Sequence, residues 1–545
     1  MTYYKLENLR LTAEFLTLNP LQVDRALDEF IAASLIGGVV ESYRIINKSV
    51  DSRRRNAELV YNLIVSSATP DLRSAGVVKL NIISEDEALS YLAVDFQHTV
   101  ADLVRNNGRL PTAPIVVGSG PAGIFCAYFL ALAGCRPIIL DCGFEVEKRS
   151  EDIKKFYQTR VLDECSNFLM GEGGAGTFSD GKLYTRINGD WYGRVVLHEF
   201  IRMGVPEEIR YLKRPHIGSD NLFTVCQKFR TEITRLGGVF KFGFEVADLW
   251  CDSGRCAGVI GSSGEKIAGE YVVIAAGVGG HKLHRALIRA GVSHQLKGFQ
   301  LGCRIEHPQK MVDNQQYHTL KRPVALGAAE YNFVSKPPAG VPGVSTFCMC
   351  PGGYVVNASS EKERLAINGM SNHARDSKNA NSALVVTVTP KDFGNHPLDG
   401  VSFQRNLEEK AYRLGKGKIP LQLYKDYLQN QVSFAFDDYE TEMKGDYTFA
   451  NLNELFPQYI NDSLKEAMTY FGKKIPHFDD DSVLLSGIES RTSSPVRIIR
   501  DEHFEANIKG IYPCGEGAGY AGGITTAAID GLKVAESVIK DYSVE

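Results

Sequence analysis

The sequence lacks several features that would assign it to a specialised class of protein. No apolar run approaches the roughly 18 residues of a membrane-spanning helix, and charges interrupt the first dozen residues, where a secretory signal would be apolar. Basic and acidic residues nearly balance, at 61 and 65, so the overall charge does not favour nucleic acid or an acidic membrane surface. We therefore expect a cytoplasmic chain without membrane association and without a nucleic-acid partner.

The cysteines also lack the patterns of special chemistry. The eleven cysteines are scattered and none forms a C-x-x-C motif, so reduced thiols are expected. Cys348 and Cys350 form a C-x-C pair, which we expect to serve packing rather than redox chemistry. No cysteine or histidine has partners at zinc-ligand spacing, so no metal site is predicted.

With 545 residues the chain is too long for a single hydrophobic core. We predict an α/β fold class with three units. A small α+β domain occupies 1–110. A Rossmann-like domain occupies 111–297, with an inserted β-meander at 237–277, and is completed by 486–545. An α+β substrate domain with an antiparallel sheet occupies 298–485.

The N-terminal segment contains an amphipathic helical stretch, "LQVDRALDEFIAASLI", between strand-like segments. Its basic group consists of Lys48, Arg53, Arg54 and Arg55. We interpret this group as a solvated face, with phosphate, nucleic acid or a partner protein as the alternatives.

The string G-x-G-x-x-G occurs three times, and its first occurrence has the context of a dinucleotide-binding turn. The segment "APIVVGSGPAGIFCAYFLALAGCRPIILD" predicts a strand at 115–117, a helix at 121–133 and a second strand ending at Asp141. Gly118 permits the tight turn, Gly120 lets a pyrophosphate approach, and Gly123 lets the helix pack on the strand. The helix N-terminus would face the phosphates and Asp141 the ribose hydroxyls. The predicted contacts of this turn also include Ser119, Pro121 and Ala122.

The second occurrence, "MGEGGAGTFSDGKL", follows a helical segment rather than a strand. Its many backbone donors and small hydroxyls suit an extended ligand that continues past a pyrophosphate. An ordinary surface loop is the alternative. The cofactor contacts predicted here are Gly173, Gly174, Ala175, Thr177, Ser179, Asp180, Gly181 and Lys182.

After these loops come the β-meander and an apolar strand that ends in Ala275, Ala276 and Gly277. This order of elements resembles the glutathione-reductase-type FAD-binding fold. The resemblance implies FAD as the cofactor, with the backbone of Val246 at the adenine and the turn at Ala276 and Gly277 close to the FAD.

Several longer blocks resemble the uncharacterised FAD-dependent dehydrogenases that are sometimes labelled NAD-utilising dehydrogenases. The blocks include "MGEGGAGTFSDGKLYTR", "LGCRIEHPQ", "FCMCPGGYVVNASSE", "ESRTSSPVR" and "GEGAGYAGGITTAAIDG". The sequence departs from the expected family pattern at "AAGVGGHKLHRAL". The resemblance implies FAD and redox chemistry, and it implies no particular substrate.

The third occurrence lies in "GEGAGYAGGI", where the chain ends before a second βαβ unit could form. We interpret this segment as the closing part of the single FAD site, formed by Gly515, Glu516, Gly522, Gly523 and Ile524. Glu516 would bind the ribitol or pyrophosphate region, and the backbone amides of 522–524 would face the flavin. No dedicated NAD(P) domain is expected, so NAD(P)H is a candidate electron donor only through transient docking.

Candidate catalytic residues lie outside the glycine motifs. Arg304, Glu306 and His307 stand together in "RIEHPQ", where Arg304 and Glu306 would share one face of a strand. His307 is a candidate acid/base, and Arg491 is a candidate anchor for an anionic substrate or FAD. A purely structural role is the alternative for each of them.

We predict an FAD-dependent oxidoreductase, a dehydrogenase or reductase, that acts on a small organic molecule. A flavin monooxygenase or oxidase, and a flavin-containing protein that binds RNA or a partner through its N-terminal domain, are the alternatives. The sequence leaves the oligomeric state open.

Overall fold

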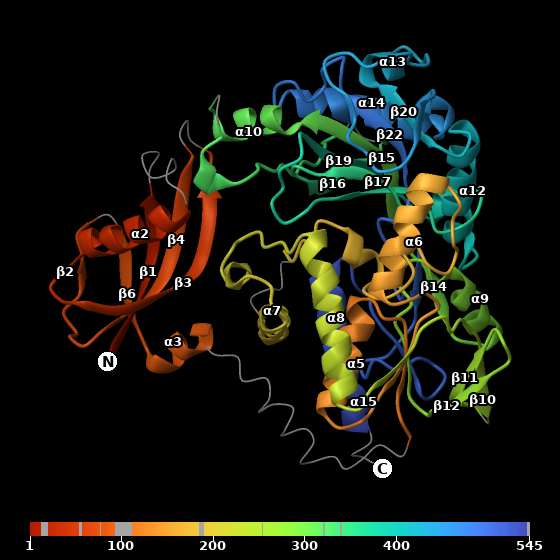
Figure 1. Cartoon of the computed structure of the whole chain (residues 1–545), viewed down its shortest axis with the longest axis horizontal. Coiled ribbons are helices and arrows are strands. Elements are labelled where there is room, and N and C mark those ends of the chain that lie inside the picture. The colour runs from red at the N-terminus through yellow and green to blue at the C-terminus, as the bar shows by residue number, and fades with distance from the viewer. Residues whose placement is uncertain are drawn as a thin grey trace.

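A computed structural model describes residues 1–11, 20–53, 57–76, 78–92, 112–184, 190–252, 254–319, 322–337 and 340–541, and its layout follows in Figure 1. The mixed α/β class predicted from the sequence is confirmed. Three sheets of four, five and six strands dominate the molecule. In the described part of the chain, no helix is both long and apolar enough to span a membrane.

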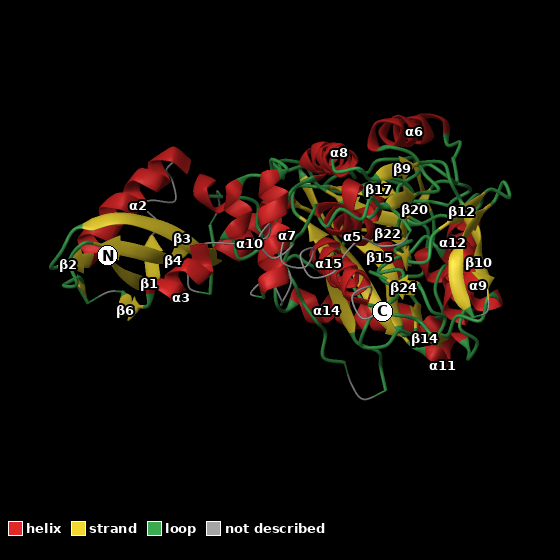
Figure 2. Cartoon of the chain, turned by 90° about the horizontal axis from the view of Figure 1, so that it is seen from below, coloured by secondary structure: helices red, strands yellow, loops and turns green. Residues whose placement is uncertain are grey.

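The N-terminal residues form a four-stranded antiparallel sheet of order β3-β4-β1-β6. This lobe stands apart from the two larger sheets in Figures 1 and 2. Strand β3 is anchored to the rest of the chain, since the backbone N–H of Lys48 donates to the carbonyl oxygen of Tyr211 over 2.7 Å. The elements are β1 (Thr2–Leu11), α2 (Pro20–Ser34), β2 (Leu35–Ile36), β3 (Val40–Asp51), β4 (Glu58–Ser67), β5 (Arg73–Ser74), β6 (Lys79–Ile83) and α3 (Glu85–Leu92).

The predicted basic group of this lobe is only partly described. The guanidinium of Arg53 donates two hydrogen bonds to the carboxylate of Asp51, over 2.9 and 2.7 Å. Arg54 and Arg55 lie outside the described residues. Arg53 is thus paired with an acidic residue of the same lobe, and this pair gives no support to the nucleic-acid alternative.

A five-stranded parallel sheet of order β24-β13-β7-β8-β9 follows. It contains β7 (Ile115–Val117), β8 (Ile138–Leu140), β9 (Val239–Lys241), β13 (Val272–Ile274) and β24 (Ile511–Pro513). The predicted meander is the three-stranded sheet of β10 (Val246–Asp252), β11 (Arg255–Gly261) and β12 (Lys266–Ala268). Strand β9, at the start of the predicted meander, belongs instead to the parallel sheet.

The parallel sheet is covered on both faces, which explains its short, wholly apolar strands. Val116 of β7 packs into one core, whereas its neighbours Ile115 and Val117 pack into the other. The helices are α5 (Pro121–Leu132), α6 (Val146–Thr159), α7 (Trp191–Arg202), α8 (Ser219–Arg235), α9 (His281–Arg289) and α15 (Ile524–Asp541), with short turns η1 (Gly174–Phe178) and η2 (Glu207–Arg210). Helices α5, α7, α8 and α15 cover the first face, and the meander with α9 covers the second.

A six-stranded sheet of order β16-β19-β15-β22-β20-β21 forms the third unit, which we call the cap. Its strands are β15 (Phe299–Pro308), β16 (Val344–Cys350), β19 (Asn379–Val388), β20 (Ile419–Leu423), β21 (Tyr447–Phe449) and β22 (Leu484–Glu489), and a hairpin of β17 (Tyr354–Asn357) and β18 (Ile367–Met370) lies beside it. Its helices are α10 (Gln309–Tyr317), α11 (Pro390–Phe393), α12 (Asp399–Leu414), α13 (Tyr424–Leu428) and α14 (Gln458–Gly472), with turns η3 (Val324–Leu326) and η4 (Leu452–Glu454).

The predicted end of this unit at residue 485 needs correction. Strand β22 pairs with both β15 and β20, so the cap sheet continues to Glu489. The chain then returns to the unit of the parallel sheet, where β23 (Val496–Ile498) pairs with β14 (His294–Leu296). A strand inside a sheet has partners on both sides, and a boundary cannot fall within it.

Candidate functional site

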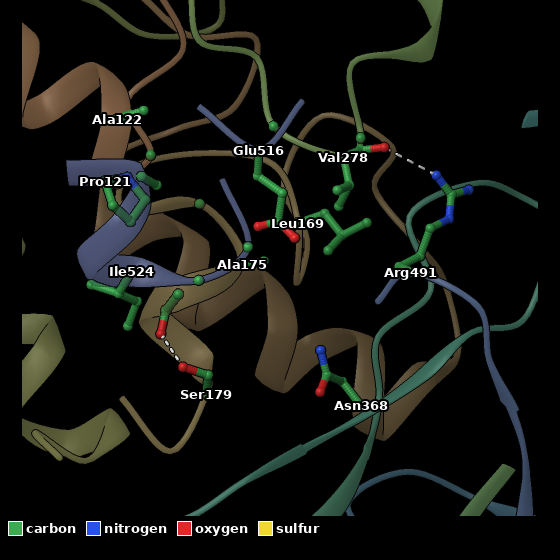
Figure 3. A pocket seen from close by; sticks show the side chains of 18 of the residues that line it. Pro121, Ala122, Leu169, Ala175, Ser179, Val278, Asn368, Arg491, Glu516 and Ile524 are labelled. Atoms are coloured by element: carbon green, nitrogen blue, oxygen red, sulfur yellow. Dashed lines mark hydrogen bonds between the residues drawn. The ribbon is translucent and has the colours of Figure 1, made fainter. Parts of the chain in front are cut away.

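A cavity of about 620 Å³ lies between the parallel sheet and the cap. Both units line it. The first contributes the glycine turn after β7, the loop 169–182, the turn after β13 and the start of α15, and the cap contributes residues of β16, β18 and the end of β22. Figure 3 shows side chains from these separate segments converging on one space. A volume of this size is within the range of small-molecule and cofactor sites.

The glycine turn is fixed by close backbone approaches. A side chain at Gly118, where φ is +104°, would meet the carbonyl oxygen of Ala275 at 2.4 Å, and one at Gly123 would meet the carbonyl oxygen of Gly118 at 1.9 Å. Asp141 accepts from the backbone N–H and hydroxyl of Ser119, over 2.8 and 2.6 Å. The acid at the end of β8 therefore shapes the turn and also lines the cavity.

Arg149, which the sequence interpretation missed, shapes the next wall of the cavity. Its guanidinium is fully buried and donates to the carbonyl oxygens of Asn167, Phe168 and Glu172, over 2.7, 2.6 and 2.7 Å. These bonds satisfy the carbonyls of a loop without regular structure. The only signal for this role in the sequence was an arginine in a helix that precedes a glycine-rich loop.

The C-terminal segment closes the cavity as predicted. Glu516 points into it near Leu169 and Val278 (Figure 3). Burial raises the pKa of Glu516 to about 7, against the effect of nearby Lys297. A carboxyl group with such a pKa exists partly in the protonated form near neutral pH, where it can donate as well as accept.

The backbone around the cavity leaves space that fits an extended ligand such as FAD. Among the described residues, nothing lies within 4 Å of where a side chain would begin at Gly277, Gly522 or Gly523, all of which line the cavity. Helix α5 also begins at the cavity, and no side chain caps its first turn at Gly120. Its free backbone N–H groups suit a phosphate.

Most of the residues predicted to contact the cofactor line this cavity. They are Gly118, Ser119, Gly120, Pro121, Ala122, Asp141, Gly174, Ala175, Ser179, Asp180, Gly181, Lys182, Val246, Ala276, Gly277, Glu516, Gly522, Gly523 and Ile524. The other four lie behind its wall: Gly123, Gly173, Thr177 and Gly515. The N–H of Gly173 donates to Ser119 and that of Gly515 to Asp530, so these two residues position the lining rather than form it.

On the cap side, Cys348 and Cys350 both line the cavity. Strand β16 has an irregularity between Phe347 and Cys350, and Cys348 has a φ of +43°. An inserted residue of this kind interrupts the regular alternation of side chains along a strand. Cys348 is exposed and Cys350 is buried, and burial raises the pKa of Cys350, so this thiol is protonated near neutral pH.

Arg304 lies directly behind the cavity and is fully buried. Its Nε and Nη2 donate to the two carboxylate oxygens of Glu489, over 2.8 and 3.2 Å. Nη2 also donates to the side-chain oxygen of Asn368 over 2.9 Å. Glu489 and Asn368 line the cavity, whereas Arg304 does not. Arg304 is thus a positioning residue for two cavity side chains rather than a catalytic one.

The structure does not support Glu306 and His307 as catalytic residues, because neither lines the cavity. The Nε2 of His307 donates to the carbonyl oxygen of Phe478 over 2.9 Å, and burial lowers the pKa of His307 to about 4. Glu306 accepts from the hydroxyl of Thr441 over 2.6 Å. The polar pattern of "RIEHPQ" serves the interior of the cap.

Arg491 lines the cavity, but its guanidinium is already bound to acidic side chains. Its guanidinium donates to Glu408 over 2.6 and 2.8 Å and to Glu361 over 3.1 Å. It also donates to the carbonyl oxygen of Val278 over 3.3 Å (Figure 3). With two carboxylates bound, Arg491 joins the cap to the turn after β13 and is a poor anchor for an anion.

Sequence comparison places the cap in a known family. Residues 298–492 match the family described as "FAD-dependent protein, C-terminal domain-like". The chain is also 41% identical over 502 residues to an uncharacterized protein of Clostridium beijerinckii, a match that covers 91% of this chain and 92% of that protein. The chain belongs to this family of FAD-dependent proteins. It is an oxidoreductase, since the flavin of FAD is a redox group, and this part of the prediction is confirmed.

Solved structures give more distant similarities. The L-proline dehydrogenase of P. horikoshii is 14% identical, with a TM-score of 0.33, and the match covers 79% of this chain and 95% of that one. The glycerol-3-phosphate dehydrogenase of Bacillus halodurans, solved with FAD, is 11% identical, with a TM-score of 0.35, over 82% of this chain and 67% of that one.

Proposed function

We propose that this protein is an FAD-dependent dehydrogenase or reductase whose small organic substrate binds between the FAD and the cap. The observation that carries this proposal is the cavity that is lined by the nucleotide-type turns on one side and by β16, β18 and β22 on the other. One space shared by a cofactor site and a second domain is typical of ligand sites at domain interfaces.

The residues of the parallel-sheet unit would hold FAD along this cavity. The turn at 118–122 and the start of α5 would meet the pyrophosphate, Asp141 a ribose and Val246 the adenine, while Glu516 and residues 522–524 would surround the ribitol and flavin. FAD supplies hydride transfer to or from a substrate when it is bound. The buried parts of the cavity wall, including the protonated thiol of Cys350, would help to exclude water.

The proposal includes no dedicated domain for a second nucleotide. NADH or NADPH would dock transiently if either serves as the electron donor. All eleven cysteines are free in the structure, which supports a reducing compartment such as the cytoplasm.

The test starts with the visible spectrum of the purified chain. We expect flavin absorbance, either directly or after reconstitution with FAD. Anaerobic titration with NADH and with NADPH then identifies a nicotinamide donor by bleaching of the flavin. A chain that stays colourless after reconstitution contradicts the proposal. Rapid reoxidation by oxygen coupled to product hydroxylation would favour the monooxygenase alternative, and copurifying RNA the nucleic-acid one.

A further inference from the structure

Two hydrogen-bond donors from different domains face the cap end of the cavity. They are the ammonium group of Lys182 and the side-chain amide of Asn368, and both residues line the cavity. Lys182 is held by Asp180, and the oxygen of Asn368 is held by two donors, so each side chain has N–H donors left for the cavity. The chemistry of these donors limits which substrates can bind there.

Lys182 is one of two cations around a single carboxylate. Its Nζ lies 3.0 Å from Oδ2 of Asp180. Arg375 also donates to both oxygens of Asp180, over 3.0 and 2.5 Å, and the hydroxyl of Ser371 donates to Oδ1. Burial would raise the pKa of Asp180, but Lys182 and Arg375 outweigh it and hold that pKa well below its usual range. The cluster of Asp180, Lys182 and Arg375 therefore carries one net positive charge.

Two neighbouring carboxylates already have partners of their own. Glu489 is paired with Arg304, and Glu330 is paired with Arg214 at 2.8 Å. The neighbouring His216 is neutral near pH 7, because burial and Arg375 lower its pKa to about 4.

The ammonium of Lys182 has capacity for a ligand. An ammonium group has three N–H donors, and Asp180 is the one ion-pair partner of Lys182 among the described residues. Burial alone would lower the pKa of Lys182, but Asp180 reverses this and raises it, so the group stays charged. Its side chain is 29% exposed, and Lys182 lines the cavity, so a ligand in the cavity can reach the ammonium group. The site is thus suited to an anion.

Asn368 is fixed as a donor toward the same space. Its side-chain oxygen accepts from Nη2 of Arg304 over 2.9 Å and from the N–H of Gly369 over 2.7 Å. These two donors determine the orientation of the amide. The nitrogen therefore faces the cavity, as Figure 3 shows. An acceptor atom on the ligand is required there.

Contacts with the cap bring the two donors to the same part of the cavity. Ser371, whose hydroxyl donates to Asp180, follows Asn368 by three residues, just past β18. A ligand that reaches both donors needs one anionic group and a second acceptor.

We propose that the substrate is a carboxylic acid whose carboxylate binds Lys182 and whose second acceptor, a carbonyl or hydroxyl oxygen, binds the amide of Asn368. This inference rests on the proposed function, because it places the substrate in the cavity shared with FAD. It assigns Lys182 to the substrate, whereas the sequence pattern suggested a contact with the cofactor.

The test titrates the oxidised, FAD-loaded full chain with matched pairs of probes, acetate with acetamide and benzoate with benzamide. The visible spectrum of the flavin reports binding. We expect a carboxylate to bind at least tenfold more tightly than its amide. Lys182→Met should weaken carboxylate binding at least tenfold and leave both amide binding and the affinity for FAD unchanged. Lys182→Arg should retain most of the carboxylate affinity.

Lys282→Met is the matched control. Lys282 also lines the cavity, but it pairs with Glu245 beside the meander, at 3.2 Å. We expect this variant to bind carboxylates as the wild type does. Equal affinity for carboxylates and amides, binding of neither, or no effect of Lys182→Met overturns the inference. Loss of FAD from Lys182→Met but not from Lys282→Met assigns Lys182 to the cofactor and also overturns it. A wild-type chain that never binds FAD contradicts the proposed function instead.

Discussion

Arg304 and Glu489 form a fully buried, two-pronged ion pair across the paired strands β15 and β22, with N–O distances of 2.8 and 3.2 Å. Arg304→Met would leave the carboxylate of Glu489 buried without its partner. Such a loss typically costs about 3–5 kcal/mol. We expect the urea midpoint of unfolding to fall accordingly. The double variant with Glu489→Gln, which removes both charges, should recover a large part of that loss, and no recovery would show that the ion pair is not the cause.

Gly522→Val should reduce the affinity for FAD without destabilising the apoprotein. Gly522 lines the cavity, has no described neighbour within 4 Å of the added carbon, and does not have a positive φ. The valine side chain would therefore take space that the cofactor needs. We expect the Kd for FAD, measured by quenching of flavin fluorescence, to rise at least tenfold, which corresponds to about 1.4 kcal/mol.

The control for this variant is Gly343→Val. Gly343 also has open space around the added carbon, but it does not line the cavity. It should leave the Kd for FAD unchanged. Equal effects of the two substitutions would mean that the cavity at Gly522 is not where FAD binds.

Glu306→Gln should change the pH dependence of stability. Burial raises the pKa of Glu306 from 4.5 to about 7. Between these values the folded chain keeps a proton that the unfolded chain has released, so the contribution of Glu306 to stability falls as the pH rises. The full loss is on the order of 3 kcal/mol. Glutamine keeps an acceptor for Thr441 and cannot ionise.

We therefore expect Glu306→Gln to be more stable than the wild type at pH 8 and to lose this advantage at pH 4.5. Thermal unfolding across this range measures the difference. Glu207→Gln, at a side chain that is 67% exposed, is the control and should follow the wild type. Parallel profiles for wild type and Glu306→Gln would refute a buried, protonated Glu306.

His307→Asn should lower stability and leave the flavin unaffected. The ring of His307 packs on Phe478, with a centroid distance of 4.6 Å, and donates to its carbonyl oxygen. Loss of that hydrogen bond in a buried site costs about 1–3 kcal/mol. The midpoint of unfolding should fall, while the flavin spectrum and the affinity for benzoate should match the wild type. A change in either of the last two would restore His307 as a residue of the site.

The sequence alone located the segments of the parallel-sheet unit that line the cavity. The turn at 118–123, Asp141 and the segment at 515–524 are each short, contiguous patterns. Strand β7 at Ile115–Val117 and helix α5 from Pro121 follow the predicted ranges closely. Local backbone geometry dictates which residues can stand there, as at Gly118 and Gly123, so the pattern can be read without tertiary contacts.

The cap side could not be predicted in the same way. The motif at 304–307 resembles an active-site cluster, but burial and partners decide the role of each residue. Arg304 meets Glu489, which is 185 residues away, and Asp180 meets Arg375 across 195 residues. The irregular pairing of β16, beside which Cys348 and Cys350 line the cavity, depends on the partner strand and cannot be read from that segment alone.

The sequence by itself determined where the glycine turns and helix N-termini on one side of the cavity lie, because their residue requirements are local. Only the tertiary structure decided which polar side chains face the cavity and which stabilise the interior. Charge balance in a buried site depends on partners that the fold brings together from distant segments. For that reason Lys182 shares its one carboxylate partner, Asp180, with Arg375, whereas Arg304 and Arg491 are paired with carboxylates of the cap.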